Sequence, residues 1–185
     1  MADSPAAERA VEALTRLVRD VPDFPEPGVL FKDIAPLLAD ADGFAAVVEA
    51  LAESGRGPDG RVVVDKVVGM EARGFILAAP VALALGVGFV PVRKAGKLPH
   101  ATHSVDYALE YGDAVLEIHA DALGPGERVL LVDDVLATGG TARATAGLVA
   151  RCGAEVAGFA VLMELIVLAG REQVGEMPVT ALLAV

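Results

Sequence analysis

A run of apolar residues from Val129 to Val132 is followed by side chains that could bind a ligand. Two adjacent carboxylates, Asp133 and Asp134, come first, and a turn rich in hydroxyls and glycines then opens a helix. Glycines let backbone N–H groups approach a phosphate, threonine hydroxyls add donors, and the N-terminus of a helix favours an anion. The turn is therefore predicted to be a phosphate cradle, formed by Ala137, Thr138, Gly139, Gly140 and Thr141.

The carboxylates are unusual beside a phosphate, because like charges repel one another. They would have a role if they bound the vicinal hydroxyls of a sugar or a metal-bound sugar. A ribose 5-phosphate would suit the segment, because its hydroxyls would bind the carboxylates and its phosphate would bind the cradle. The alternative is a strand end with a capping aspartate and a tight turn. The segment matches neither the Walker A pattern nor the Gly-x-Gly-x-x-Gly pattern of dinucleotide-binding domains.

Alternating strands and helices are expected to position this cradle. A β-branched run predicts a buried strand over Val62–Val68, ended at Gly69, and helical spacing predicts a helix over Ala6–Arg19. The expected fold is α/β, with a mainly parallel central sheet flanked by helices. Such a sheet binds ligands at the carboxyl ends of its strands, here after Gly69, Val92 and Val132. The further expected elements are helices Gly43–Ser54, Gly74–Leu85 and Thr141–Arg151 and strands Val87–Val92, Arg128–Asp133, Val156–Met163 and Val179–Val185.

Two segments interrupt this alternation. Closely spaced prolines between Asp20 and Gly28 predict a stiff loop. From Arg93 to Asp121 the chain carries charges, all the histidines and both tyrosines, and it is expected to leave the sheet. Within this stretch, Tyr107–Tyr111 and Val115–His119 are predicted to pair as antiparallel strands.

Composition favours one globular domain over residues 1–185. Hydrophobic residues make up 54% of the chain and charged residues 22%, and a chain of this length can bury a core without a disulfide. No apolar stretch reaches the about 18 residues of a membrane-spanning helix, and no secretory signal peptide is recognised, so a cytoplasmic location is expected. The single cysteine, Cys152, is interpreted as a small buried packing residue rather than a reactive thiol.

The net charge of −11 counts against nucleic-acid binding, since a negative surface repels the phosphate backbone. Aromatic residues amount to 4%, which leaves little material for stacking on bases. His100 and His103 lack the neighbouring cysteines or carboxylates that a zinc site needs, and they are interpreted as loop residues. Nucleic acid, a membrane and a structural zinc ion are therefore not expected as partners.

The cradle segment resembles the 5-phosphoribosyl 1-diphosphate binding signature of the type I phosphoribosyltransferase family. Further segments, spread from about Asp23 to Arg171 in the family's order, are similar to its adenine-specific members: Asp23–Ile34, Glu71–Phe75, Val90–Pro99 and Leu109–Gly112. The resemblance implies the type I phosphoribosyltransferase fold, with a base-binding element (the hood) at about residues 20–38 and a flexible catalytic loop at about 95–112. It also implies a homodimer that transfers ribose 5-phosphate from the donor to N9 of adenine, giving AMP and diphosphate, with Mg²⁺ carried by the donor.

The resemblance also implies where the diphosphate binds. Backbone groups of a short turn would hold it, namely those of Glu71, Ala72, Arg73 and Gly74. A diphosphate leaving group needs compensation by cations, and this acidic chain groups several of them in the matched segments. The alternative is that they are solvated surface charges. The cations are Arg73, Arg93, Lys94 and Lys97.

Adenine is assigned by the resemblance to a site with two faces. The Arg73 side chain would lie against one face, and Val29, Leu30 and Phe31 would cover the other, with backbone groups at Leu30 reading the edge of the base. The stiff proline loop agrees with this role. The alternative is that Phe24 and Phe31 fill a core.

Glu110 is placed by the resemblance near the imidazole edge of adenine, where N9 loses its proton as it attacks C1′. A carboxylate can act as a general base if closure of a loop desolvates it and raises its pKa. Glu110 and Arg73 are therefore the candidate catalytic residues. The alternative is that Glu110 faces solvent and the rate comes from stabilising an oxocarbenium-like centre and the leaving diphosphate.

One dipeptide departs from the family's pattern. Members commonly carry Ser-Tyr or Thr-Tyr in the flexible loop, whereas this chain carries Asp106-Tyr107, and a carboxylate would repel the diphosphate that a hydroxyl could bind. Tyr107 is kept as a donor-binding residue, together with Asp133, Asp134 and the cradle. Two alternatives stay open: action on another purine base, and a noncatalytic protein that binds the donor as an effector.

Overall fold

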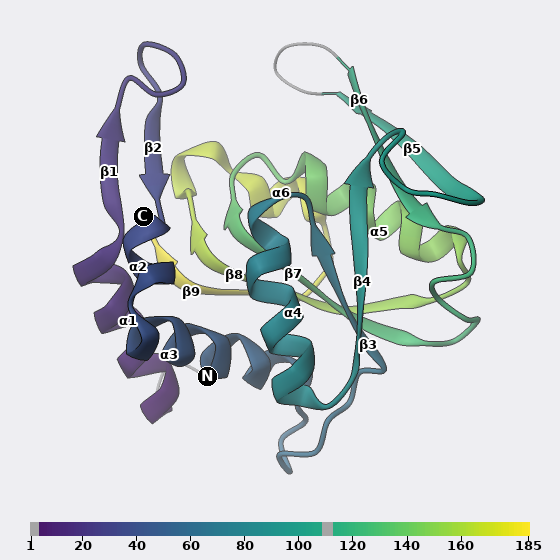
Figure 1. Cartoon of the computed structure of the whole chain (residues 1–185), viewed down its shortest axis with the longest axis horizontal. Helices are drawn as coiled ribbons and strands as arrows, with labels where there is room; N and C mark the ends of the chain where they lie inside the picture. Colours follow the sequence, from purple (N-terminus) through teal and green to yellow (C-terminus); the bar gives the residue numbers. More distant parts are fainter. Residues whose placement is uncertain (1–3, 109–112) are drawn as a thin grey trace. The chain divides into compact units, whose positions relative to one another are not determined.

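The computed structural model describes residues 4–108 and 113–185 (Figure 1). Their contacts divide the chain into two compact units, Met1–Ala50 and Leu51–Val185. The expectation of one domain over residues 1–185 stays a prediction.

The first unit begins with α1 (Pro5–Leu17), close to the expected helix. Ser4 caps the helix, because its hydroxyl accepts a hydrogen bond from the Ala7 backbone N–H at 3.1 Å. Its buried face follows the helical period over Ala6, Ala10, Ala13 and Leu14.

The expected stiff loop is the connection of a β-hairpin that the sequence analysis did not predict. Strands β1 (Arg19–Pro22) and β2 (Leu30–Asp33) pair antiparallel on either side of it. Inside the loop, the Asp23 carboxylate accepts a hydrogen bond from the Gly28 N–H at 2.7 Å. The unit continues with α2 (Ala35–Ala39) and α3, which runs over Ala41–Ala52 and so ends just beyond the unit.

The second unit contains a seven-stranded sheet in the order β5-β6-β4-β3-β7-β8-β9 (Figure 1). The five neighbouring strands β4, β3, β7, β8 and β9 pair parallel. In contrast, β6 pairs antiparallel with both β4 and β5. A mainly parallel α/β sheet is thus confirmed. The strands are β3 (Lys66–Met70), β4 (Gly88–Lys94), β5 (Thr102–Ala108), β6 (Asp113–His119), β7 (Arg128–Leu136), β8 (Glu155–Glu164) and β9 (Val179–Ala184).

Two long helices cover opposite faces of this sheet, α4 (Arg73–Leu85) and α5 (Gly140–Arg151). Successive residues of a strand face opposite sides. Val68 lies in a buried cluster with Leu148 of α5, whereas Gly69 faces α4, because a Cβ on Gly69 would lie 2.7 Å from the Cβ of Ala78. The shorter helical elements are η1 (Glu53–Gly55), η2 (Ile166–Leu168) and α6 (Gly170–Val174).

Two details differ from the expected strands. The run Val62–Val68 was expected to be a strand, but the ladder begins only at Lys66 and continues through Gly69 to Met70. Gly69 was expected to end the strand but lies within it. The glycine is needed there because a Cβ would collide with α4.

The segment between Arg93 and Asp121 does not leave the sheet, contrary to expectation. Its two strands do pair with each other, and β6 extends the main sheet by pairing with the end of β4 at Arg93 and Lys94. The first strand begins earlier than predicted, at Thr102, and its predicted end at Tyr111 lies outside the described residues.

Candidate active site

The phosphate cradle (Ala137–Thr141) lies where β7 ends and α5 begins, at the carboxyl edge of the parallel strands. Gly139 caps the helix with a φ of +82°, a conformation that side-chain-bearing residues rarely adopt. A cavity of about 70 Å³ opens at this turn, lined by Asp133, all the cradle residues and Phe159, among others. Backbone N–H groups at a helix N-terminus can hold an anion here.

The carboxylates that precede the cradle lie within β7 rather than after it. The strand was expected to end at Asp133 but continues to Leu136. Asp134 is buried, and its carboxylate pairs with the Arg73 guanidinium at the start of α4 at 2.8 Å. Asp133 accepts a hydrogen bond from the Asp134 backbone N–H at 2.9 Å.

Gly74 lets α4 begin against these carboxylates. A Cβ on Gly74 would lie 2.8 Å from Oδ1 of Asp133 and 3.1 Å from the Val132 carbonyl oxygen. The absence of a side chain therefore sets how closely Arg73 approaches β7. Burial, and next the negative charge of Asp134, raise the pKa of Asp133 well above its usual range.

Glu71 gathers cations that the sequence analysis assigned to the diphosphate. Its side chain, 9% exposed, accepts hydrogen bonds at 3.2 Å from Nε of Arg93 and from the Lys94 backbone N–H, and it also pairs with the Lys97 ammonium. Burial acts to raise the pKa of Glu71, but the bonds from Lys97, Lys94 and Arg93 outweigh it and hold that pKa below its usual value. Glu71 is thus ionised in this arrangement.

The predicted cation cluster is therefore split between two carboxylates. Arg93 and Lys97 meet at Glu71, whereas Arg73 pairs with Asp134. The Lys94 side chain is exposed. Ala72, also exposed, connects Glu71 to the helix that starts at Arg73.

Three of the residues expected to hold adenine, Val29, Leu30 and Phe31, belong to the first unit, whereas the fourth, Arg73, begins α4 in the second unit. Val29 and Leu30 are 43% and 50% exposed, and Leu30 and Phe31 open β2. Phe24 meets Phe31 edge to face, with ring centroids 5.0 Å apart. Phe24 is 51% exposed, so the alternative in which it fills a core is wrong.

Glu110, the candidate general base, lies outside the described residues. The backbone of Tyr107 belongs to β5, opposite Ala114 of β6. Asp106 is exposed on the same strand, opposite Val115. The loop residues Glu110 and Tyr107 therefore stay predictions as site residues.

Cys152 and the histidines were expected to have no functional role. Cys152 is buried, as expected, and burial raises the pKa of its thiol. His100 is exposed at a bend, whereas the expectation that His103 lies in a loop is wrong, because it belongs to β5. Over residues 4–108 and 113–185, no group of three or more His, Cys, Asp or Glu side chains is placed to hold a metal ion, and no helix is long and apolar enough to span a membrane.

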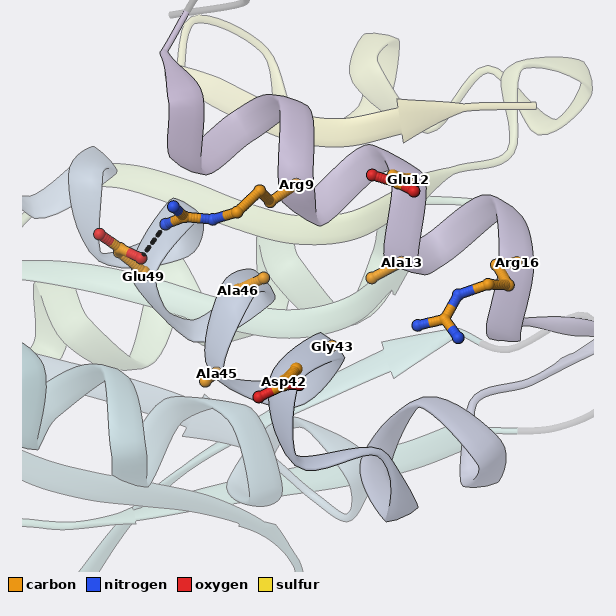
Figure 2. A pocket seen from close by; sticks show the side chains of 9 residues that line it. All are labelled: Arg9, Glu12, Ala13, Arg16, Asp42, Gly43, Ala45, Ala46 and Glu49. Carbon is orange, nitrogen blue, oxygen red and sulfur yellow. Dashed lines mark hydrogen bonds and ion pairs between the residues drawn. The ribbon is translucent and has the colours of Figure 1, made fainter.

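A larger cavity, of about 460 Å³, lies in the first unit between α1 and α3 (Figure 2). Small residues such as Ala13 and Gly43 line it, and charged side chains surround them, with Arg9 and Glu49 paired across it at 2.6 Å. No motif predicted it. The remaining lining residues are Glu12, Arg16, Asp42, Ala45 and Ala46.

Glu164 and Arg171 were not proposed as functional residues from the sequence. Glu164 ends β8 and is buried, and Arg171 follows in α6 and pairs with it. A glutamate that ends a buried apolar strand was a usable signal, because a buried carboxylate requires a partner.

Comparison with known proteins places this geometry in a family. Residues 38–178 match the family model of the phosphoribosyl transferase domain. An adenine phosphoribosyltransferase of Nocardioides sp. is 68% identical over 181 residues, 98% of this chain and 97% of that protein. The adenine phosphoribosyltransferase of Streptomyces coelicolor is 64% identical, and the match covers 86% of each chain.

Solved structures agree with these relatives. The adenine phosphoribosyltransferase of Rhodothermus marinus superposes with a TM-score of 0.88 at 50% identity, covering 96% of this chain and 99% of that one. The enzyme of Saccharomyces cerevisiae, solved with an imino-altritol bisphosphate and adenine, has a TM-score of 0.89 at 38% identity and covers 95% and 99%. The fold, the cradle and the matched domain define the class as a phosphoribosyltransferase. Within that class, the chain belongs to the adenine phosphoribosyltransferase family.

Proposed function

We propose that the protein transfers ribose 5-phosphate from 5-phosphoribosyl 1-diphosphate to N9 of adenine, giving AMP and diphosphate. The observation that carries the proposal is the phosphate cradle at the carboxyl edge of the sheet, with Asp133 lining the same cavity. A phosphate site beside a carboxyl that could accept hydrogen bonds from sugar hydroxyls suits a phosphorylated ribose. The family to which the chain belongs supports adenine as the acceptor.

The cradle would hold the 5-phosphate of the donor. Backbone N–H groups at Gly139 and Gly140 and the hydroxyls of Thr138 and Thr141 would donate to its oxygens. Asp133 would accept hydrogen bonds from the ribose hydroxyls. Asp134 would act through Arg73, which it holds at 2.8 Å.

The diphosphate would leave toward the cations near Glu71. As the C1′–oxygen bond breaks, its electron pair departs with the diphosphate, and Arg93, Lys94 and Lys97 would stabilise that charge. Glu71 keeps Arg93 and Lys97 together before the donor binds. Closely placed cations of this kind cost no reorganisation at the moment of reaction.

Adenine would form the new bond from N9 to C1′ and lose the N9 proton. Val29, Leu30, Phe31 and Arg73 are the residues proposed to bind the base. Glu110 is the proposed acceptor of the proton. Turnover by Glu110→Gln equal to that of the wild type would remove this role from Glu110.

Mg²⁺ is proposed to arrive with the donor. Asp133 and Asp134 supply the oxygen ligands that Mg²⁺ prefers, and Asp134 is already paired with Arg73, so the residues fit a metal that the diphosphate brings rather than one held by the protein alone. Bound there, the ion would neutralise part of the leaving-group charge.

A homodimer and a cytoplasmic location complete the proposal. Sedimentation of the purified protein tests whether it is a dimer.

The test is formation of AMP and diphosphate from the donor and Mg²⁺ with adenine, hypoxanthine, guanine and uracil in parallel reactions. We expect turnover with adenine alone, because a hydrogen-bonding site discriminates strongly between amino and oxo groups. Turnover with another purine would change the substrate. Tight donor binding without turnover on any base would favour the noncatalytic alternative.

A further inference from the structure

Helix α6 approaches the phosphate cradle most closely through its backbone at Gly170. A Cβ on Gly139 would lie 2.5 Å from the Gly170 carbonyl oxygen, and a Cβ on Gly170 would collide with the Ala137 carbonyl oxygen. Each segment contributes one glycine that faces a backbone carbonyl of the other, so neither position has room for a side chain. The position of Gly170 therefore limits where the cradle can lie.

Arg171, the next residue, fixes α6 to the end of the sheet. Its Nε lies 2.8 Å from both carboxylate oxygens of Glu164, and a second guanidinium nitrogen lies 2.7 Å from Oε2. The remaining nitrogen donates to the Val179 carbonyl of β9 at 3.2 Å. The Glu164 side chain is only 11% exposed, so this ion pair is largely shielded from water on the carboxylate side.

The ion pair lies next to the start of the cradle. Glu164 stands opposite Leu136 in the parallel ladder of β7 and β8, and Leu165 donates to the Leu136 carbonyl at 2.9 Å. Ala137, the first cradle residue, follows directly. The helix behind the cradle is also tied to α6, because Arg143 donates to the Gln173 side chain at 3.0 Å.

We propose that Glu164 and Arg171 are a positioning pair that holds α6 against the cradle and thereby sets the affinity for the 5-phosphate of the donor. This inference rests on the proposed function and deepens it. Among the described residues, those lining the cradle cavity come from β7, the cradle, α5 and Phe159, so the pair acts through Gly170 rather than by touching the ligand. Small displacements of such a site weaken binding strongly.

The experiment compares Arg171→Met with the wild type. We expect the KM for the donor to rise about tenfold, while the KM for adenine changes less than about twofold and kcat falls less than the KM rises. The dissociation constant of ribose 5-phosphate, measured by calorimetry, should rise by the same factor as the donor KM. A merely structural defect would lower the fraction of active protein, and so kcat, without raising the donor KM more than the adenine KM.

Two further variants separate geometry from charge. Arg171→Lys keeps a cation beside Glu164 but loses the bidentate contact, so an intermediate donor KM is expected. In the double variant Glu164→Gln/Arg171→Met, the donor KM should be no higher than in Arg171→Met alone, because the residues act as a pair. A donor KM that is clearly higher in the double variant than in Arg171→Met alone would overturn the pairing.

Lys66→Met is the matched control. It removes another partly buried cation, which pairs with Glu127 at 2.8 Å at the amino ends of the strands, far along the sheet from the cradle edge. Its donor KM should equal that of the wild type. A donor KM raised equally by Lys66→Met and Arg171→Met would overturn the inference.

An unchanged donor KM and ribose 5-phosphate affinity in folded Arg171→Met would also overturn it. If Arg171→Met does not fold, Arg171→Lys decides, and wild-type values there count against the pair. Failure of the proposed function is recognised separately: a wild-type protein that makes no AMP refutes the reaction, and ribose 5-phosphate binding by the same variants still tests the positioning pair.

Discussion

Asp133 and Asp134 are neighbours in β7, but their carboxyls have different electrostatic surroundings. Asp134 faces the Arg73 guanidinium at 2.8 Å. Asp133 is desolvated and lies beside the negative charge of Asp134, and both effects raise its pKa. A carboxyl kept in unfavourable surroundings at the edge of a phosphate site is typical of a functional residue.

The raised pKa of Asp133 predicts an unusual effect on stability. A carboxyl whose pKa is higher in the folded protein than in the unfolded chain lowers the free energy of unfolding as pH rises through that range. Asp133→Asn keeps an oxygen for the Asp134 N–H. We expect it to raise the free energy of unfolding by about 1 kcal/mol at about pH 7.5. The gain should shrink toward about pH 4, where Asp133 of the folded protein already carries its proton because its pKa is raised.

Urea denaturation at both pH values measures this effect. Asp121→Asn, which changes an exposed aspartate after β6, is the control and should show no gain at either pH. The same Asp133→Asn variant should lose most of its activity if Asp133 binds the ribose hydroxyls. A variant less stable than the wild type at neutral pH would contradict the electrostatic account.

Lys97 provides a second test at the level of single residues. Glu71 holds Lys97 beside Arg93, and the proposed diphosphate site uses both cations. We expect Lys97→Met to raise the KM for the donor about tenfold, because a charge-assisted contact to the diphosphate is lost, and to leave the KM for adenine unchanged. Initial rates at varied donor concentration measure this. Arg61→Met removes an 86% exposed cation elsewhere in the second unit, and an equal shift there would argue against a local role.

At the level of elements, two glycine variants separate the effect of the contact between the cradle and α6 from the effect of backbone strain. Gly139 and Gly126 have similar φ values, +82° and +77°, but nothing lies within 4 Å of a Cβ on Gly126. Gly126→Ala should therefore cost about 1 kcal/mol of stability from strain alone. Gly139→Ala should cost more and should also raise the donor KM, since its Cβ would meet the Gly170 carbonyl. Thermal denaturation and initial rates of both variants measure the difference, and equal effects would contradict it.

The β5–β6 hairpin carries the departure from the family's pattern. Asp106 is exposed on β5 directly before Tyr107. A carboxylate near the diphosphate weakens donor binding, so Asp106→Ser should lower the donor KM about threefold, as expected for one partly screened charge. Asp121→Ser is the control at an exposed position after β6. A donor KM that rises in Asp106→Ser would show that the carboxylate assists binding.

For the whole molecule, the net charge of −11 separates an enzyme from a nucleic-acid-binding regulator. A strongly negative protein repels duplex DNA, and low salt strengthens that repulsion. We therefore expect no mobility shift of duplex DNA even at low ionic strength, with or without the donor. A shift that appears only with the donor would revive the regulator alternative.

Many elements could be predicted because their signals are local. The alternation of β-branched strands and helices gave β7, β8, β9 and α5 within a few residues, since side-chain periodicity reports which face is buried. The hairpin around the proline loop was missed, because short exposed strands such as Arg19–Pro22 carry little periodicity. The attachment of β6 to β4 was also missed, since strand pairing between distant segments has no local signal.

The candidate site also has one part with a local signal in the sequence and another that depends on contacts between distant segments. The cradle and the adjacent carboxylates are a continuous segment, so residue type and spacing were enough to indicate a phosphate site and, with the other motifs, the family. The partners of the charges were decided only by the folded chain. Glu71 meets Lys97 because the sheet brings the ends of β3 and β4 together. Glu164 meets Arg171 because α6 packs beside the end of β8. An ion pair depends on distances of a few ångströms in space, and these are set by tertiary packing rather than by sequence neighbours.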